Sequence, residues 1–133
     1  MRVLVTGGAG FIGSHAVVAL TQAGHEAVVV DNLSNATPSV MARVAKITGH
    51  EPEFHQADIR DFEAMSRIAS SGFDACMHFA ALKAVGESVA QPLRYYDNNV
   101  GGTITLVQAL GDAGVRNLVF SSSAPVYGDT ETL

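Results

Sequence analysis

The sequence predicts one α/β domain, a doubly wound parallel sheet with helices on both faces. Short apolar runs rich in β-branched residues alternate with segments of helical periodicity, and a glycine-rich turn joins the first run to the first helix. The chain has 133 residues, 47% of them hydrophobic and 16% charged, which suits one core and leaves no room for a second full domain. We therefore expect a single domain over residues 1–133, with the default strand order 3-2-1-4-5.

The first thirty residues predict a strand–helix–strand unit. Residues 2–6 form a β-branched run broken by Gly7, and apolar positions recur at helical spacing over residues 11–23 before Gly24. Residues 26–30 return to strand chemistry. This is the length of a βαβ crossover, so a parallel sheet begins here.

The alternation continues to the end of the chain. We expect helices over residues 40–48, 61–71 and 92–113, the second capped by Asp61 and the third ended by Gly114. Strands are expected over residues 53–56, 75–79 and 117–121. The strand over residues 117–121, the fifth in the chain, is the last element that the pattern predicts.

Glycines at positions 7, 10 and 13 mark the turn between the first strand and the first helix. In a phosphate-binding loop, Gly7 allows the tight turn, Gly10 lets the backbone approach a pyrophosphate, and Gly13 lets the helix pack close to the sheet. Free N–H groups at the helix start then meet the anion. Three glycines alone also fit an ordinary turn, but a strand before them and a helix after them favour a dinucleotide.

Asp31 ends the second strand, near the offset at which a dinucleotide fold places its ribose-binding acid. Its carboxylate can accept from a ribose hydroxyl and would repel a 2′-phosphate, so NAD is favoured over NADP. No arginine in the next ten residues reverses that preference. The alternative is that Asp31 only caps the turn formed by residues 31–34.

Charge and composition exclude several other classes. The net charge is -5 and the eight Lys and Arg residues are scattered, which argues against a nucleic-acid partner. No secretion signal or apolar stretch of membrane-spanning length is found, and Cys76 is alone, so we expect a cytoplasmic protein with no membrane partner. The five histidines lack metal-ligand spacing and are expected at the surface or at helix ends; Cys76 is expected to be a small buried hydrophobe.

Four further runs carry a family resemblance. Residues 58–61 read D-I-R-D, residues 78–88 read H-F-A-A-L-K-A-V-G-E-S, residues 95–99 read Y-Y-D-N-N, and residues 121–123 are serines. Together with the glycine turn they resemble UDP-glucose 4-epimerases (UDP-galactose 4-epimerases) of the extended short-chain dehydrogenase/reductase superfamily. The runs A-L-K-A-V-G-E-S and Y-Y-D-N-N are the most particular to that family, and the resemblance spans the whole chain.

The resemblance implies a set of cofactor-binding residues. Phe11 and Ile12 would lie against the pyrophosphate, residues 31–36 along the adenosine ribose, Asp58 and Ile59 at the adenine edge, and residues 79–83 at the nicotinamide end. The complete set, glycines included, is Gly7, Gly10, Phe11, Ile12, Gly13, Asp31, Asn32, Ser34, Asn35, Ala36, Asp58, Ile59, Phe79, Ala80, Ala81, Lys83 and Asn98. Ser123 would be the catalytic residue of this chain, hydrogen-bonded to the reacting 4-hydroxyl of a UDP-sugar substrate.

Some of these residues also have ordinary interpretations. Without the family, Lys83 is a solvated lysine, Asn98 a helix-surface amide, and Ser123 part of a serine run that satisfies loop backbone. Two residues depart from the family pattern: Ala81 stands where many relatives have glycine, and Pro125 stands where threonine is common. Pro125 lacks an N–H donor and stiffens the loop, which makes the placement of Ser123 less secure.

In such epimerases a tyrosine takes the proton of the 4-hydroxyl while hydride moves to tightly held NAD, giving a 4-keto intermediate. A lysine four residues later lowers the pKa of that tyrosine. This sequence has no Tyr-x-x-x-Lys, and Tyr127 followed by Glu131 is expected to be a loop aromatic. We therefore expect a truncated chain that lacks the substrate-binding domain and does not epimerise alone. Missing later strands would leave an apolar sheet edge uncovered, so we also expect a homodimer or other homo-oligomer.

Two alternatives remain open. One is the cofactor domain of a related sugar-nucleotide dehydratase or decarboxylase, which the A-L-K-A-V-G-E-S run disfavours. The other is a non-catalytic NAD-binding module, which the missing Tyr-x-x-x-Lys supports.

Overall fold

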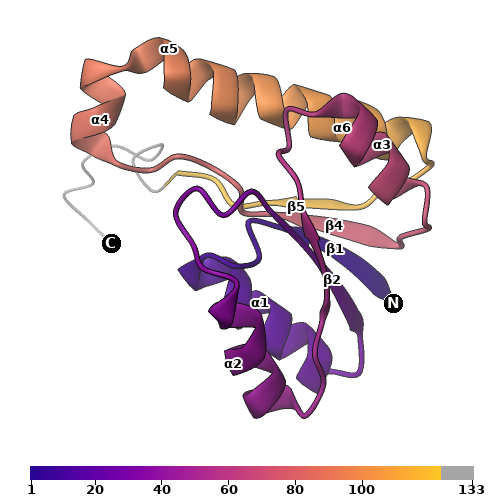
Figure 1. Ribbon diagram of the computed structural model, residues 1–133. Coiled ribbons are helices and arrows are strands. Elements are labelled where there is room, and N and C mark those ends of the chain that lie inside the picture. The colour runs from indigo at the N-terminus through magenta and orange to yellow at the C-terminus, as the bar shows by residue number, and fades with distance from the viewer. Residues whose placement is uncertain (124–133) are drawn as a thin grey trace, which may run out of the picture.

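A five-stranded parallel sheet forms the centre of the molecule. The computed structural model describes residues 1–123 of the chain. The strands are β1 (Arg2–Thr6), β2 (Glu26–Asp31), β3 (Glu53–Gln56), β4 (Ala75–His78) and β5 (Leu118–Phe120), in the order β3-β2-β1-β4-β5 (Figure 1). Every neighbouring pair is parallel. The predicted doubly wound sheet and its strand order are therefore confirmed.

Helices fill the crossovers between these strands. They are α1 (Phe11–Gln22), α2 (Ser39–Thr48), α3 (Phe62–Ala69), α4 (Val85–Ala90), α5 (Pro92–Tyr95) and α6 (Gly102–Asp112), with a π-helical segment η1 (Tyr96–Gly101) between the last two. Asp61 caps α3 as predicted, because its side chain accepts from the N–H of Ala64 at 3.0 Å. The predicted helix over residues 92–113 is helical throughout most of that range, but its regular periodicity is interrupted by η1.

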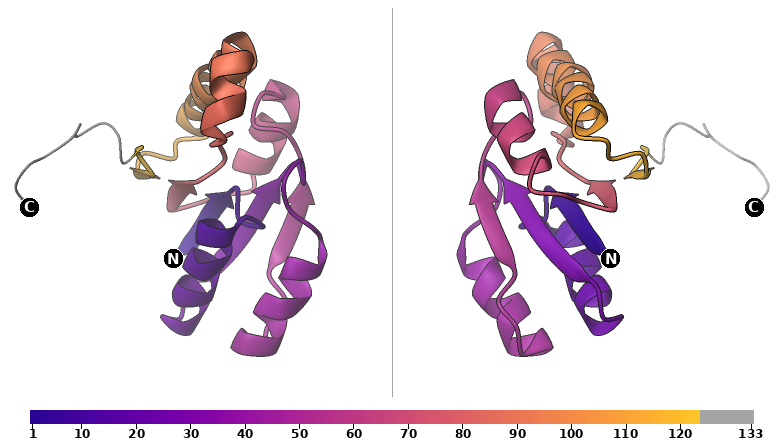
Figure 2. Two further views of the ribbon diagram at one scale, coloured as in Figure 1. Left: turned by 90° about the vertical axis from the view of Figure 1, so that its left-hand side faces the viewer. Right: turned by 90° about the vertical axis from the view of Figure 1, so that its right-hand side faces the viewer.

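Alternate residues of the central strands feed two separate cores. Leu4 and Val28 pack with α3 and α6 residues such as Met65 and Leu106 on one face. Val5 and Val29 pack with Val17 of α1 and with α2 residues on the other face. The edge-on views of Figure 2 show these layers, with α1 and α2 on one side of the sheet and α3 and α6 on the other. Burial on both faces explains why β1 and β2 are almost continuously apolar.

Arg2 fastens the amino ends of the strands. Its guanidinium donates to Glu26, Glu53 and the Ser71 side chain at 2.8–2.9 Å, and lies 4.6 Å from the centre of the Phe73 ring. These two carboxylates raise the Arg2 pKa, with the Glu26 hydrogen bond as the largest cause. The longer loops, residues 32–38, 57–61 and 79–84, lie at the opposite, carboxyl edge of the sheet.

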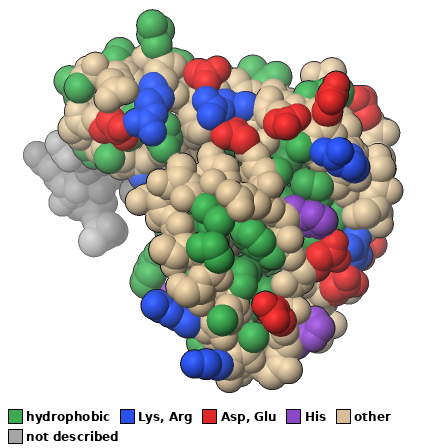
Figure 3. All heavy atoms as spheres, in the orientation of Figure 1, with side chains coloured by type: hydrophobic (Ala, Val, Ile, Leu, Met, Phe, Trp, Pro, Cys, Tyr) green, Lys and Arg blue, Asp and Glu red, His purple; other side chains and the backbone are tan. Residues whose placement is uncertain are grey.

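The surface carries charges of both signs. On the face seen in Figure 3, basic and acidic side chains lie interspersed along the upper helices. Within the described residues, no helix combines the length and apolar character needed to cross a bilayer.

Candidate functional site

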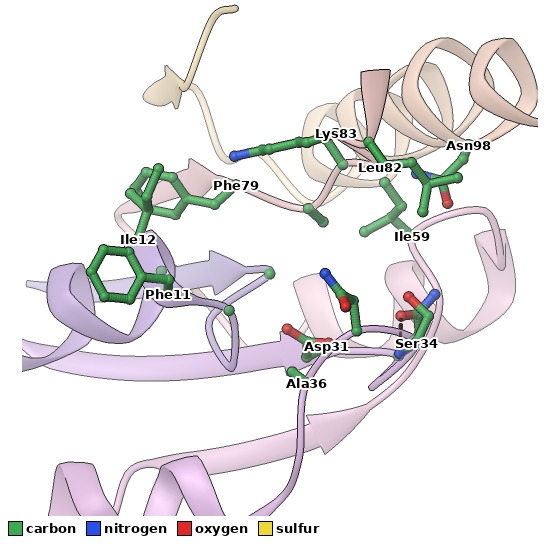
Figure 4. Close-up of a pocket in the computed structure, with 18 of the residues that line it drawn as sticks. Phe11, Ile12, Asp31, Ser34, Ala36, Ile59, Phe79, Leu82, Lys83 and Asn98 are labelled. Carbon is green, nitrogen blue, oxygen red and sulfur yellow. Dashed lines mark hydrogen bonds between the residues drawn. The ribbon is translucent and has the colours of Figure 1, made fainter. Parts of the chain in front are cut away.

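A cavity of about 700 Å³ opens at the carboxyl edge of the sheet, where ligands of open α/β sheets bind. Figure 4 shows its two walls: Phe11, Ile12, Asp31 and Ser34 on one side, and Phe79, Lys83 and Asn98 on the other. Every residue predicted to bind cofactor lines this cavity, with the exception of Asp58. The structure thus brings together residues spread from position 7 to position 98.

The glycine turn forms the floor of the cavity. Gly7 has a φ of +70°, and a Cβ built there would lie 2.6 Å from the Ala80 amide nitrogen. A Cβ on Gly13 would lie 2.2 Å from the Gly7 carbonyl oxygen. Both positions therefore exclude any side chain, and the close contact of α1 with the turn at Gly13 agrees with the role predicted for that residue.

The amino end of α1 faces the cavity without a capping side chain. Its N-cap is Gly10, which contributes only backbone. The N–H groups of residues 11–13 precede the first helical hydrogen bonds and have no carbonyl of their own helix to pair with. Phe11 and Ile12 are 82% and 49% exposed. This end of α1 can therefore accept an anion and offer apolar surface beside it.

Asp31 connects the glycine turn to the loop after β2. One carboxylate oxygen accepts from the Ala9 N–H at 3.1 Å and the other from the Leu33 N–H at 2.8 Å. The second contact supports a left-handed Leu33, with a φ of 59°. Asp31 thus makes the turn-capping contact that the alternative interpretation predicts, but it also lines the cavity. Each of its oxygens retains a further lone pair for a ligand hydroxyl.

Asp58 is engaged by its own surroundings. It accepts two hydrogen bonds from the Arg60 side chain, at 2.8 and 2.9 Å, and one from the Asn32 amide at 3.0 Å. The Arg60 guanidinium, above all, holds the Asp58 pKa far below its ordinary value. Arg60 continues to Asp97 at 2.7 Å. This network joins the loops after β2 and β3 to η1, and a direct cofactor contact by Asp58 stays a prediction.

The opposite wall combines β4, the segment after it and η1. Asn98 is only 8% exposed, so the interpretation as a helix-surface amide is wrong. The π-helical turn directs it inward. Lys83 is exposed, and Figure 4 shows its side chain extending along the rim toward Phe79.

His78 corrects a second expectation. It is 2% exposed within β4 and not at the surface or a helix end. Strand alternation places it on the same face of β4 as buried Cys76, next to Thr103 of α6, and burial lowers its pKa to about 4. Cys76, two residues earlier, is fully buried as expected, and burial raises the pKa of its thiol to about 12.

Ser123 follows β5 and is exposed, and it is not among the residues that line the cavity. Its predicted catalytic role stays a prediction. Pro125 and Tyr127 lie outside the described residues.

Sequence reasoning missed one cluster at the cavity end. Glu87 accepts hydrogen bonds from Arg94 and from the Tyr95 hydroxyl, and all three line the cavity. The short helix α4 and the start of α5 bring them together. The signal was present, since two family-like runs contain Glu87 and Tyr95, but a six-residue helix has too little periodicity to predict this packing.

The glycine turn, the uncapped helix and the acid at the end of β2 define a Rossmann-type α/β domain. A family model described as "NAD dependent epimerase/dehydratase family" matches residues 3–133. The chain belongs to this family.

Its relatives include many UDP-glucose 4-epimerases. The chain is 55% identical over 129 residues to that of Neisseria meningitidis serogroup B, a match that covers 96% of this chain and 38% of the relative. A Klebsiella pneumoniae relative of the same name is 54% identical, with 97% of this chain and 94% of the relative covered. The chain thus spans about two fifths of the length of most of these relatives.

Solved structures agree closely with this fold. UDP-glucose 4-epimerase from Stenotrophomonas maltophila, with bound NAD and formylated UDP-arabinopyranose, superposes with a TM-score of 0.96 at 56% identity, over 99% of this chain and 40% of that one. The Bifidobacterium longum enzyme, in complex with NAD+ and UDP, gives 0.95 at 44% identity, over 100% and 40%.

Proposed function

We propose that this chain is the NAD-binding part of a UDP-glucose 4-epimerase, which interconverts UDP-glucose and UDP-galactose. The observation that carries the proposal is the shared cavity. The residues predicted to bind cofactor come from five separate segments, and all but Asp58 line one space at the carboxyl edge of the sheet. Relatives of more than 50% identity that bear this name support it.

The cavity fits a dinucleotide in its chemistry. Gly7 and Gly13 let the turn pack closely against Ala80 and α1, and the α1 amides beside the turn suit a diphosphate. Asp31, at the end of the neighbouring strand β2, suits an adenosine ribose and disfavours a 2′-phosphate. Phe79 and Lys83 would border the nicotinamide end.

In the complete enzyme NAD would accept and return the hydride at the sugar C4. The residues described here would bind and orient the dinucleotide, and Ser123 would hydrogen-bond the 4-hydroxyl of the substrate. The proton of that hydroxyl requires a base, which we place outside this chain, because the sequence holds no Tyr-x-x-x-Lys. We therefore expect the 133-residue chain alone to bind NAD without epimerising UDP-galactose.

Calorimetric titration with NAD and NADP tests the binding part of the proposal. We expect saturable NAD binding and at least about tenfold weaker NADP binding, since a carboxylate beside a 2′-phosphate is repulsive. Absence of NAD binding, or equal affinity for both dinucleotides, would contradict it.

The activity is tested in a longer protein that contains this sequence. Incubation with UDP-galactose should give UDP-glucose of unchanged mass. A product lighter by one water would instead identify a dehydratase, the second reaction in the family description. A longer protein that binds NAD and leaves both sugars unchanged would support the non-catalytic module.

We also propose that the chain associates with copies of itself in the cytoplasm. Val89, Leu93 and Ile104 are 79%, 81% and 63% exposed along the outer helices. Exposed apolar side chains on these helices, α4, α5 and α6, can pair with the same side chains of a second copy about a two-fold axis. Sedimentation equilibrium should give a dimer, and Leu93→Glu should give a monomer; a monomeric unmodified chain would contradict this.

A further inference from the structure

The segment between β4 and α4 has no regular secondary structure, although it forms one wall of the cavity. Leu82, Lys83 and Ala84 all line the cavity. A backbone without helix or sheet partners needs other groups to fix it. Two side chains from the neighbouring helix supply them.

Asn99 of η1 satisfies both backbone groups of Leu82. Its Oδ1 accepts from the Leu82 N–H at 2.8 Å, and its Nδ2 donates to the Leu82 carbonyl oxygen at 2.9 Å. One turn earlier, the Tyr95 hydroxyl accepts from the Ala84 N–H at 3.1 Å and lies 2.9 Å from the Ala84 carbonyl oxygen. Alternate residues of the segment are thus held on one side, as residues of a strand are held by a neighbouring strand.

Asn99 also orients a residue that faces the cavity. The Asn98 side-chain amide donates to Asn99 Oδ1 at 2.9 Å. This leaves the Asn98 Oδ1 for a ligand donor. Asn99 itself does not line this cavity; it lies against a smaller one on the other side of the wall, together with Tyr96 and Val100.

The position of Asn99 is fixed in turn by the sheet. Its carbonyl oxygen accepts from the Thr103 hydroxyl at 2.6 Å, and that hydroxyl lies 2.9 Å from Nε2 of buried His78. The π-helical turn brings Asn98 and Asn99, adjacent in sequence, to opposite sides of the cavity wall. Such turns are frequent at functional sites.

We propose that Asn99 is a positioning residue, which sets the backbone of residues 82–84 and the Asn98 amide for the nicotinamide half of the dinucleotide without touching it. The inference rests on the proposed NAD site and adds a residue to it. It requires that loss of the Asn99 amide weaken binding of the nicotinamide half and spare the adenosine diphosphate half, which the glycine turn and Asp31 would hold.

The test compares NAD with ADP in calorimetric titrations of the chain. In Asn99→Ala we expect NAD to bind about tenfold more weakly, because several hydrogen bonds that preorganise the wall are lost, and ADP to bind within twofold of the unmodified chain. Asn99→Asp has nearly the same volume but places an oxygen against the Leu82 carbonyl, and it should also weaken NAD selectively. A loss of cavity packing alone would spare this variant.

Asn117→Ala is the matched control. The Asn117 amide also donates to a backbone carbonyl, that of Asp74 at 2.9 Å, but at the amino edge of the sheet. It should leave both affinities unchanged. Equal weakening of NAD and ADP in Asn99→Ala, or unchanged NAD affinity, would overturn the role of Asn99; failure of the unmodified chain to bind NAD or ADP would overturn the proposed site itself.

Hydrogen exchange on the unmodified chain gives a result that does not depend on how a variant folds. The Leu82 and Ala84 amides, which donate to Asn99 and Tyr95, should exchange more slowly than the Lys83 amide between them. Addition of NAD should slow Lys83 more than Leu82. Rapid exchange at Leu82 before NAD is added would contradict the positioning role.

Discussion

Thr6 Oγ1 lies 2.6 Å from Nδ1 of His78, so that β1 and β4 are joined by buried side chains as well as by their backbones. The other ring nitrogen, Nε2, faces Thr103, whose hydroxyl already donates to Asn99. Nε2 must therefore carry the hydrogen, and Nδ1 accepts from Thr6. Both nitrogens of the neutral ring are thus hydrogen-bonded. A second proton, on Nδ1, would require the Thr6 hydroxyl to turn and accept a hydrogen bond instead of donating one.

This arrangement predicts a loss of stability in mild acid. Burial lowers the folded-state pKa of His78 to about 4 from its ordinary 6.5, so the unfolded chain binds a proton first as pH falls. The His78 contribution is fully present above pH 6.5 and declines toward pH 4. The total amounts to roughly 3.5 kcal/mol at about 1.4 kcal/mol per pKa unit.

Urea denaturation at several pH values measures this slope. His78→Asn is the comparison, because it removes the titrating group and keeps a polar side chain. Its stability should be lower near neutral pH and flatter between pH 6.5 and pH 4, with a remaining decline below that range from Asp58, whose pKa is lowered in the folded chain. Parallel profiles would exclude His78 as the cause.

Gly13→Ala should destabilise the chain and abolish dinucleotide binding. The added Cβ would lie 2.2 Å from the Gly7 carbonyl oxygen, so α1 must move away from the turn. Forced overpacking of this kind costs about 1–3 kcal/mol. Thermal unfolding gives the stability and calorimetry gives the NAD affinity.

Gly111→Ala provides the comparison within another helix. Its Cβ would have no neighbouring atom within 4 Å, and alanine favours the helix by up to about 1 kcal/mol. This variant should be slightly more stable and bind NAD normally. A Gly13→Ala chain that unfolds and binds like the unmodified one would show that the close contact at Gly13 is unnecessary.

Asp61→Ala should lower stability by about 1 kcal/mol, because it removes the hydrogen bond to the Ala64 N–H at the start of α3. Asp61→Asn retains an acceptor and should differ from the unmodified chain by only a few tenths of that amount. Chemical denaturation distinguishes them. Equal losses in the two variants would point to charge, and not capping, as the contribution of Asp61.

The sheet was predictable because its information is local and repeated. β1 and β2 are nearly continuous apolar runs, the first of which is followed by Gly7, and the βαβ spacing leaves few topologies. The glycine turn and Asp31 could be paired in advance because both follow neighbouring parallel strands and so end at the same edge. The other residues of the cavity wall that were predicted came from the family resemblance.

The parts that escaped prediction depend on contacts distant in sequence. An extra residue in a helical turn leaves the apolar pattern of residues 92–113 almost unchanged, so η1 and the inward position of Asn98 gave no signal. His78 read as a surface histidine because its partners, Thr6 and Thr103, are far from it in the chain. Asp58 is hydrogen-bonded to Arg60 and does not line the cavity, and the spacing of residues in the sequence does not show which partner a carboxylate will take.

Asp31→Asn tests the assignment of the dinucleotide. The amide keeps one acceptor for the Ala9 or Leu33 N–H but removes the negative charge from the cavity. A hydrogen bond to a charged group contributes about 1.5–3 kcal/mol, so NAD should bind roughly tenfold or more weakly. NADP should gain relative to NAD, because the repulsion of its 2′-phosphate is relieved.

Asp74→Asn is the matched control for this change. Asp74 also accepts from a backbone N–H, that of Arg2 at 2.7 Å, but at the amino edge of the sheet. Its NAD and NADP affinities should equal those of the unmodified chain. If Asp31→Asn weakens both dinucleotides by the same factor, the carboxylate serves only to hold the turn at Leu33, and discrimination between NAD and NADP must come from elsewhere in the loop.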